Sequence, residues 1–156
     1  MHLYLARHGQ ALSKYEDPHR PLSNQGLVDI RKMAAFLARP KATEISWILH
    51  SGKLRAEQTT AILAEHLPPS GGVGVSDGLA PMDDPAVWSD RLAVQKENLM
   101  LVGHLPHLER LTALLLAGTA DQSIVRFKAG GVVCLERNEG GDWSLRWMVA
   151  PEMLTE

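Results

Sequence analysis

The sequence predicts an α/β fold in which a largely parallel central sheet is flanked by helices, a three-layer sandwich. Two observations lead to this expectation. Through most of the chain, short apolar runs of strand length alternate with segments whose apolar residues recur at helical spacing. In the C-terminal part the helical spacing stops, and strand-like runs follow one another. We therefore expect a parallel sheet that is extended by antiparallel strands at its end.

The first half of the chain predicts two strand–helix pairs. Residues 2–6 form a short apolar run that ends at Arg7-His8-Gly9, and residues 10–22 are polar and typical of a loop. Ser23 is suited to cap a helix whose apolar face spans 27–37 and which Pro40 ends. Residues 45–49 predict a second strand and residues 53–67 a second helix.

The second half continues the alternation before it changes character. We expect a short third strand at Val73 and Val75, a helix over 85–96, a buried strand over 99–102, and a helix that begins near Pro106. Three strands are expected after that helix, with a hairpin loop at 138–142 between the last two. They cover residues 123–127, 132–137 and 143–149.

Length and composition restrict the function. With 156 residues, the chain suits one domain, residues 1–156, with one core. A net charge of -2 argues against a general nucleic-acid binder, which needs a basic surface. The first residues lack the pattern of a signal peptide and no apolar run is long enough to cross a membrane, so neither a leader nor a membrane span is expected. The single cysteine, Cys134, lies in an apolar run and is expected to be buried, which fits a cytoplasmic protein.

Basic side chains and histidines follow three of the predicted strands. Arg7 and His8 come after the first strand, Arg55 after the second, and His104 after the fourth. In a parallel sheet these strand ends meet at one edge, and the helix starts beside them favour anions. Alone, Arg55 could be a solvated residue on a first helical turn, and His104 a capping or core histidine.

Four short motifs in this order resemble the blocks of the histidine phosphatase superfamily, which has a phosphoglycerate mutase-like fold. They span the chain to about residue 115. The Arg20-Pro21-Leu22 form and the short length are most similar to the SixA-type phosphohistidine phosphatases. The four motifs are Leu5-Ala6-Arg7-His8-Gly9-Gln10, Pro21-Leu22-Ser23-x-x-Gly26, Leu54-Arg55-Ala56-x-x-Thr59 and Val102-Gly103-His104.

The resemblance implies a role for each matched residue. His8 would be the nucleophile that accepts the phosphoryl group, with its second ring nitrogen held by an acceptor such as a backbone carbonyl. Arg7, Arg55 and His104 would complete a phosphate pocket, and Arg20 would add a contact. The chemistry agrees, since arginine forks match phosphoryl oxygens and a protonated His104 would add another donor.

Two departures from the family pattern matter. Gly52 stands where the family usually has proline, so we expect a looser turn after the second strand. Larger members also use an acidic residue as a general acid, often glutamate, and residues 66–96 contain no glutamate. Asp83 or Asp84 could take that role, although solvated loop carboxylates are common at such positions.

The motifs and the resemblance predict a phosphohistidine phosphatase that acts on a phosphorylated protein, such as a histidine phosphotransfer domain. We expect it to be a monomer that needs no cofactor or metal. Two alternatives remain open: a phosphatase of small phosphate esters, and a non-catalytic phosphate-binding protein. The pair His104 and His107 could suggest a metal site, but no third ligand accompanies it in the sequence. No nucleic-acid or membrane partner is expected.

Overall fold

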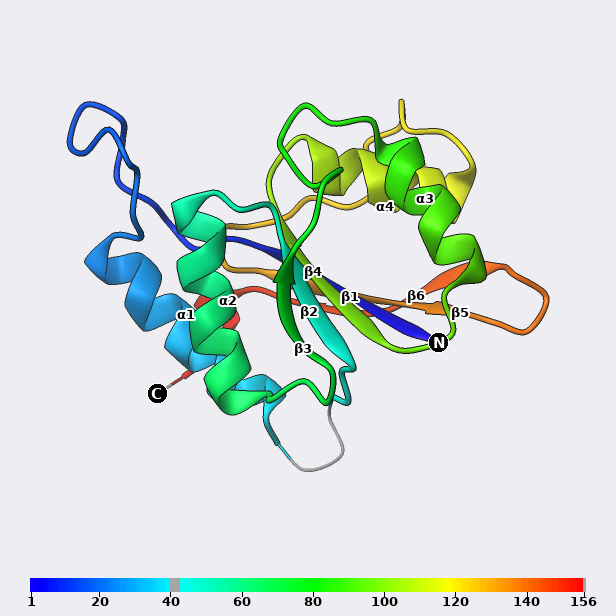
Figure 1. The fold of residues 1–156 in the computed structure, drawn as a ribbon, viewed down its shortest axis with the longest axis horizontal. Helices are drawn as coiled ribbons and strands as arrows, with labels where there is room; N and C mark the ends of the chain where they lie inside the picture. The colour runs from blue at the N-terminus through cyan, green and yellow to red at the C-terminus, as the bar shows by residue number, and fades with distance from the viewer. Residues whose placement is uncertain (40–42, 156) are drawn as a thin grey trace.

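The computed structural model describes residues 1–39 and 43–155 of the chain (Figure 1). Strands and helices alternate up to the fourth helix, and two strands and a short 3-10 helix follow. In chain order the elements are β1 (His2–Arg7), α1 (Asn24–Leu37), β2 (Trp47–His50), α2 (Leu54–His66), β3 (Gly72–Val75), α3 (Pro85–Val94), β4 (Leu99–Gly103), α4 (His107–Ala117), β5 (Val132–Arg137), β6 (Trp143–Val149) and η1 (Pro151–Met153).

The strands form one mixed sheet in the order β3-β2-β4-β1-β5-β6. The first four strands in this order run parallel to one another, whereas β5 is antiparallel to both β1 and β6. β1 is therefore central, with β4 on one side and β5 on the other. This confirms the predicted parallel sheet with antiparallel strands at its C-terminal end, and it brings the carboxyl ends of β1, β2 and β4 to the same edge.

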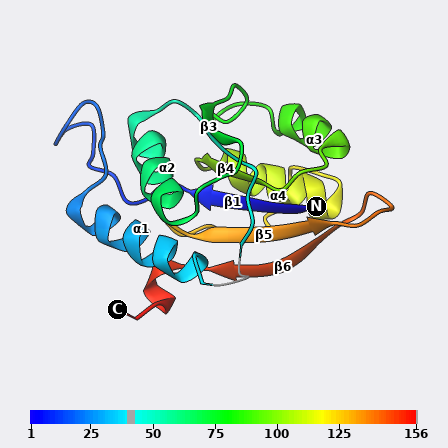
Figure 2. The ribbon, with the colours of Figure 1, turned by 60° about the horizontal axis from the view of Figure 1, so that its bottom comes forward.

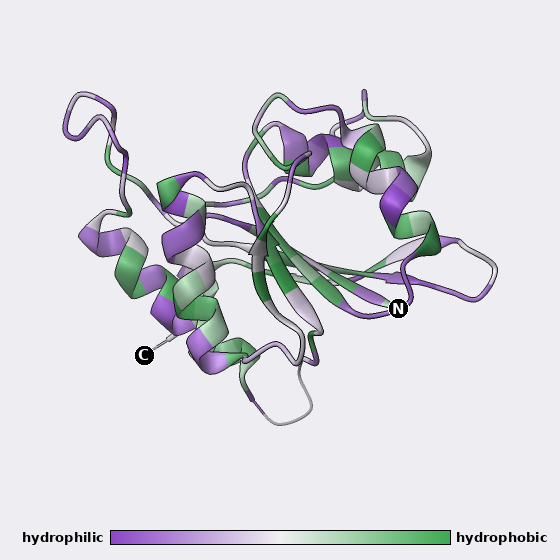
Figure 3. Ribbon diagram, in the orientation of Figure 1, coloured by the Kyte–Doolittle hydropathy of each residue, from purple (hydrophilic) through white to green (hydrophobic). Residues whose placement is uncertain are grey.

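Helices cover both faces of the sheet, as Figure 2 shows from below. Alternate side chains of β1 pack into the two cores, which is why the strand is apolar from Leu3 to Ala6. Tyr4 and Ala6 belong to the cluster that α1 and α2 cover, and Leu3 and Leu5 to the cluster that α3 and α4 cover. Figure 3 shows the corresponding apolar strands between helices whose outer faces are more polar.

The ends of the helices agree with local sequence signals. The Ser23 hydroxyl accepts the Gly26 N–H at 3.0 Å, which confirms Ser23 as the cap of α1. That helix ends at Leu37, and Pro40, the residue expected to end it, lies outside the described residues. At the other end of the chain, α4 stops at Gly118, whose φ of 78 gives the left-handed cap that glycine adopts easily.

One predicted strand is wrong. Residues 123–127 have no regular secondary structure, although Val125 and Phe127 are buried as an alternating strand would bury them. Their side chains enter the core cluster beneath α4, while the backbone N–H of Phe127 bonds to a side chain, the carboxylate of Glu109. The predicted burial of Cys134 is confirmed, since its side chain is inaccessible and burial raises its thiol pKa to about 11.

Candidate active site

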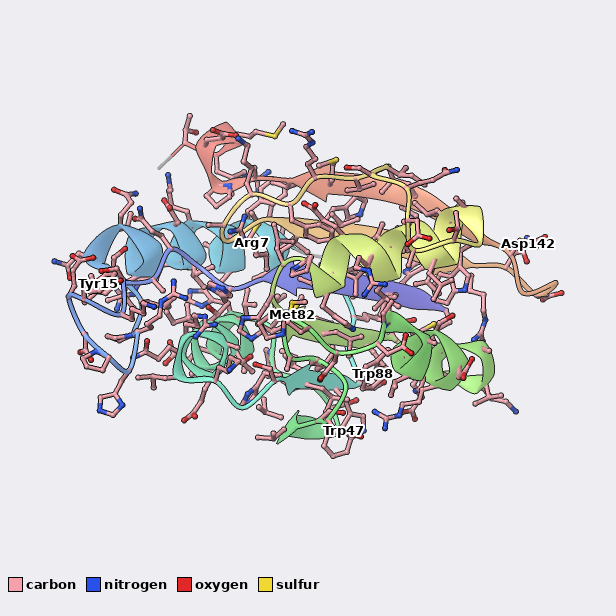
Figure 4. All side chains as sticks on the ribbon, turned by 90° about the horizontal axis from the view of Figure 1, so that it is seen from above. Arg7, Tyr15, Trp47, Met82, Trp88 and Asp142 are labelled. Carbon is pink, nitrogen blue, oxygen red and sulfur yellow. The ribbon has the colours of Figure 1, made fainter. Side chains whose placement is uncertain are left out.

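The predicted nucleophile, His8, and the four residues predicted to bind phosphate come together at the carboxyl edge of the sheet. Arg7 is the last residue of β1, and His8 follows it directly. Arg55 lies in the first turn of α2, and His104 lies between β4 and α4. In Figure 4, which views the molecule from above, Arg7 lies at the end of β1, while Tyr15 lies far out on the loop that carries Arg20.

The ring of His8 is held in one tautomer. Its Nδ1 lies 2.7 Å from the carbonyl oxygen of Gly9, and because a carbonyl only accepts, Nδ1 must carry the proton. The Nε2 atom then keeps its lone pair. Burial, with smaller contributions from the charges of Arg55, Arg7 and Arg20, lowers the pKa of His8 to about 4, although the hydrogen bond to the Gly9 carbonyl acts to raise it. At neutral pH this ring is therefore an uncharged nucleophile, with the fixed carbonyl acceptor expected from the sequence.

His104 lies beside this ring, with 4.9 Å between the ring centroids. Its Nε2 is 2.6 Å from the hydroxyl oxygen of Ser51, which also accepts the Lys53 N–H at 3.3 Å. Burial, followed by the nearby charge of a protonated His8, lowers the pKa of His104 to about 3. The protonated state expected from the sequence therefore does not hold in the empty site, and a neutral His104 can donate one hydrogen bond.

Three nitrogen atoms around His8 are buried without a hydrogen-bond partner among the described residues. They are Nε of Arg7, Nε of Arg55 and Nδ1 of His104. Buried donors nearly always have an acceptor in a folded protein, and the two arginine nitrogens are donors in every state, whereas Nδ1 of His104 is a donor when its Nε2 accepts the Ser51 hydroxyl. A phosphoryl group has three acceptor oxygens and up to two negative charges, which this cluster matches.

Arg20 reaches the site from the loop before α1. Its Nε donates to the carbonyl oxygen of Leu12 at 3.0 Å, and its charge lowers the pKa values of both His8 and Arg55. Its φ of 50 makes it a non-glycine residue in the left-handed region. Such strain persists where surrounding contacts hold it and is common at binding sites. Here it places a third arginine beside the nucleophile.

The loop that carries His8 lies in direct backbone contact with α1. A Cβ on Gly26 would be 2.1 Å from the carbonyl oxygen of Gln10, and a Cβ on Gly9 would be 2.8 Å from Cγ1 of Ile30. The contact at Gly26 is with backbone and cannot be relieved, so glycine is required there, whereas a Cβ on Gly9 would force the Ile30 side chain to shift. The first turn of α1 therefore fixes the path of the chain just after the nucleophile.

Two hydroxyl residues contribute contacts that were not predicted. Thr59 accepts the Gly9 N–H at 3.1 Å and donates to the carbonyl of Arg55 at 2.8 Å, which ties the nucleophile loop to α2. Its position four residues after Arg55, on the same helix face, is a sequence signal that could have found it. Ser51, which bonds to His104, has no comparable signal, because its contact crosses between two strand ends.

The remaining sequence expectations concern the acids and the turn. Asp83 accepts the Ala80 N–H and Asp84 accepts the Ala86 N–H, both at 2.9 Å, so each carboxylate has a local structural contact. Gly52, at the turn expected to be looser than in the family, has a φ of 90, which proline cannot adopt. Among residues 1–39 and 43–155, no three His, Cys, Asp or Glu side chains are grouped to hold a metal. No described helix has the length and hydropathy of a membrane span.

Known proteins resemble this chain in sequence and in fold. A family model described as the histidine phosphatase superfamily (branch 1) matches residues 3–83. The phosphohistidine phosphatase SixA of Escherichia coli (strain K12) is 30% identical over 156 residues, which cover 97% of this chain and 94% of that protein. A structure of the protein histidine phosphatase SixA complexed with tungstate matches with a TM-score of 0.85 and 28% identity, over 98% of this chain and 99% of that one.

A more distant neighbour shares the fold alone. The alpha-ribazole phosphatase from Shigella flexneri has a TM-score of 0.78 at 17% identity, over 97% of each chain. The six-stranded sheet and its flanking helices thus match those of solved phosphatases, as the sequence predicts.

Proposed function

The chain belongs to the histidine phosphatase superfamily and is a phosphatase, and from that premise we propose that it removes phosphoryl groups from histidine side chains of a partner protein. The observation that carries this proposal is the fixed tautomer of His8 among buried, unpartnered nitrogen donors. A neutral nucleophile and an anion-binding shell are what a covalent phosphoryl transfer needs. The similarity to SixA, which has been solved with the phosphate analogue tungstate, supports the choice of substrate.

The proposed first step is attack on the substrate by His8. Its Nε2 lone pair forms a bond to phosphorus, and the bond between phosphorus and the substrate histidine breaks. The substrate ring, protonated at its other nitrogen, leaves as neutral imidazole. Arg7 and Arg55 hold the phosphoryl oxygens in this step, and the Gly9 carbonyl stabilises the charge that develops on the His8 ring.

In the second step water attacks the phosphorus of phosphorylated His8. The phosphorus–nitrogen bond breaks, the electron pair returns to Nε2, and the product leaves as dihydrogen phosphate, which carries the oxygen and both protons of the water. The neutral His104 donates one hydrogen bond to the phosphoryl group, and a bound dianion raises the pKa of His104 above its value in the empty site. We assign these roles to His8, Arg7, Arg55 and His104, with Arg20 as a further phosphate contact.

The substrate class follows from the leaving group. An alkyl phosphate needs a proton on its departing oxygen, and imidazole leaves without such help because its conjugate acid has a pKa of roughly 6.5. Asp83 accepts a backbone N–H of its own loop and Asp84 caps α3, so in the described part of the chain neither of these two candidates is free of a structural contact, as an acid for ester hydrolysis should be. We therefore propose a phosphorylated protein, such as a histidine phosphotransfer domain, as partner of a monomeric, cytoplasmic, single-domain enzyme that needs no metal or cofactor.

A side-by-side hydrolysis assay tests this function. We expect a phosphohistidine protein, or phosphoramidate, to turn over faster than a panel of alkyl and sugar phosphates, and the variant with Asn at both 83 and 84 to keep that activity. A preference for a sugar or alkyl phosphate that is lost when either aspartate is changed would favour the small-molecule alternative. Absence of turnover on every substrate, with tungstate still bound, would favour a non-catalytic phosphate-binding protein.

A further inference from the structure

The peptide unit of Phe127 lies between Arg7 and an acidic side chain of α4. Arg7 donates from Nη1 to the carbonyl oxygen of Phe127 at 2.8 Å, and the N–H of Phe127 donates to Oε2 of Glu109 at 2.9 Å. The charge of Glu109 also reaches Arg7, since it raises the pKa of the guanidinium against the lowering caused by burial. Glu109 and Arg7 are thus linked through one peptide plane.

This peptide needs an anchor because it lies outside regular secondary structure. The sheet does not hold the backbone of residues 123–128, and the Phe127 N–H is satisfied by a carboxylate instead of a neighbouring strand. Glu109 is in the first turn of α4, the helix that begins just after His104. One helix start therefore positions His104 directly and, through Glu109, the peptide that holds Arg7.

The orientation of Arg7 depends on that carbonyl. A guanidinium group is planar and rigid, so fixing Nη1 fixes the directions of its other donors. The Nε atom of Arg7 is buried without a partner and belongs to the donor cluster around His8. If the Phe127 carbonyl moved, the donors left for a phosphoryl group would turn away from it, and small displacements of such groups reduce turnover strongly.

We propose that Glu109 is a positioning residue for phosphoryl transfer, which aims the guanidinium of Arg7 by holding the Phe127 peptide. The assignment rests on the proposed function for its catalytic consequence. The proposal concerns one hydrogen bond, from the Phe127 N–H to the Glu109 carboxylate. It requires an acceptor atom at the end of the side chain and a side chain long enough to place that atom there. It does not require the negative charge of Glu109.

Two substitutions separate the effect of the length of the Glu109 side chain from the effect of its charge. Glu109→Gln keeps the length and a carbonyl acceptor but removes the charge. Glu109→Asp keeps the charge but withdraws the carboxylate by one carbon–carbon bond, about 1.5 Å, beyond hydrogen-bonding reach of the Phe127 N–H. The same two changes at Glu65, an exposed acid on α2, serve as matched controls. The readouts are kcat and KM for phosphoramidate and, independently of turnover, orthovanadate affinity by calorimetry.

We expect Glu109→Gln to stay within about threefold of the wild type and Glu109→Asp to lose about tenfold or more in kcat/KM, with a parallel loss of orthovanadate affinity. The Glu109→Asp effect should shrink to less than about twofold in an Arg7→Lys background, because coupled residues are not additive. Normal behaviour of both variants, equal losses in both, or a larger loss in Glu109→Gln would overturn the proposal. A wild type that binds orthovanadate but hydrolyses nothing would contradict the proposed function instead, and the affinity comparison would still decide the role of Glu109.

Discussion

Lowering the pH from 7 to 5 should destabilise the folded protein through the histidines of the pocket. His8 has a folded-state pKa of about 4, and its unfolded value is near 6.5. Between these two values the unfolded chain binds a proton at this side chain that the folded protein does not. Stability is therefore fully present above pH 6.5 and is lost as the pH falls toward 4, with no further loss from this group below that.

The size of the effect follows from proton linkage. A single side chain of this kind contributes a slope of up to about 1.4 kcal/mol per pH unit, which amounts to about 2 kcal/mol between pH 7 and pH 5. His104, with its pKa lowered to about 3, adds a loss of the same order. The pKa values of His50 and His107 are lowered as well, so the total slope of the wild type contains contributions from outside the pocket.

Urea unfolding followed by tryptophan fluorescence at several pH values measures this slope. The variant His8→Asn, which cannot titrate, isolates the contribution of His8 between pH 7 and pH 5, because His8 of the folded protein is uncharged in this interval and exerts no charge effect on His104. We expect the free energy of unfolding of His8→Asn to fall less steeply from pH 7 to pH 5, by about 2 kcal/mol over the interval. Parallel curves for the two proteins would refute the conclusion that burial keeps His8 neutral.

Three further outcomes test the chemistry. His8→Ala should abolish turnover, and wild-type enzyme quenched during turnover should carry an acid-labile, base-stable phosphate on His8; substantial activity in the variant would exclude the covalent route. Arg55→Lys should lower kcat/KM by roughly 100-fold or more, because lysine keeps the charge but loses the bidentate guanidinium geometry. Arg20→Lys should lower kcat/KM by less. Normal turnover of Arg55→Lys would show that the pocket is assigned wrongly. Activity should survive a chelator, because the arginines already neutralise the phosphoryl group, and orthovanadate should inhibit; loss on chelation that one metal ion restores would contradict this.

The order of elements could be predicted because each depends on local periodicity. The apolar residues 3–6 and 99–102 are buried on both faces, as parallel strands between two helical layers must be. The prediction of a strand at 123–127 was wrong because side-chain periodicity alone does not show how the backbone is hydrogen-bonded. Burial of Val125 and Phe127 has the same pattern in a strand and in an irregular segment. Only the partner of the Phe127 N–H, here Glu109, distinguishes the two, and side-chain periodicity carries no information on it.

The residues that meet at the site could be predicted from the sequence, but their protonation states could not. Strand ends at one edge of a parallel sheet bring Arg7, His8 and His104 together whatever the details of the loops. The protonation states could not be predicted, because they depend on burial and on the number of cations around each ring. His104, expected to be protonated, has its pKa lowered to about 3 in the pocket.

The central place of β1 has a consequence for how the chain acquires its fold. β1 is the first element made, yet its partners come late, since Leu3 is in register with Leu99 on one side and with Leu135 on the other. Pairings between residues so far apart in the sequence form slowly and expose apolar strands in the meantime. During synthesis the strand that leads to His8 must therefore remain without its neighbours until β4 and then β5 have emerged. The proposed phosphate pocket includes His104, which follows β4 directly, so it cannot be complete before β4 has been made.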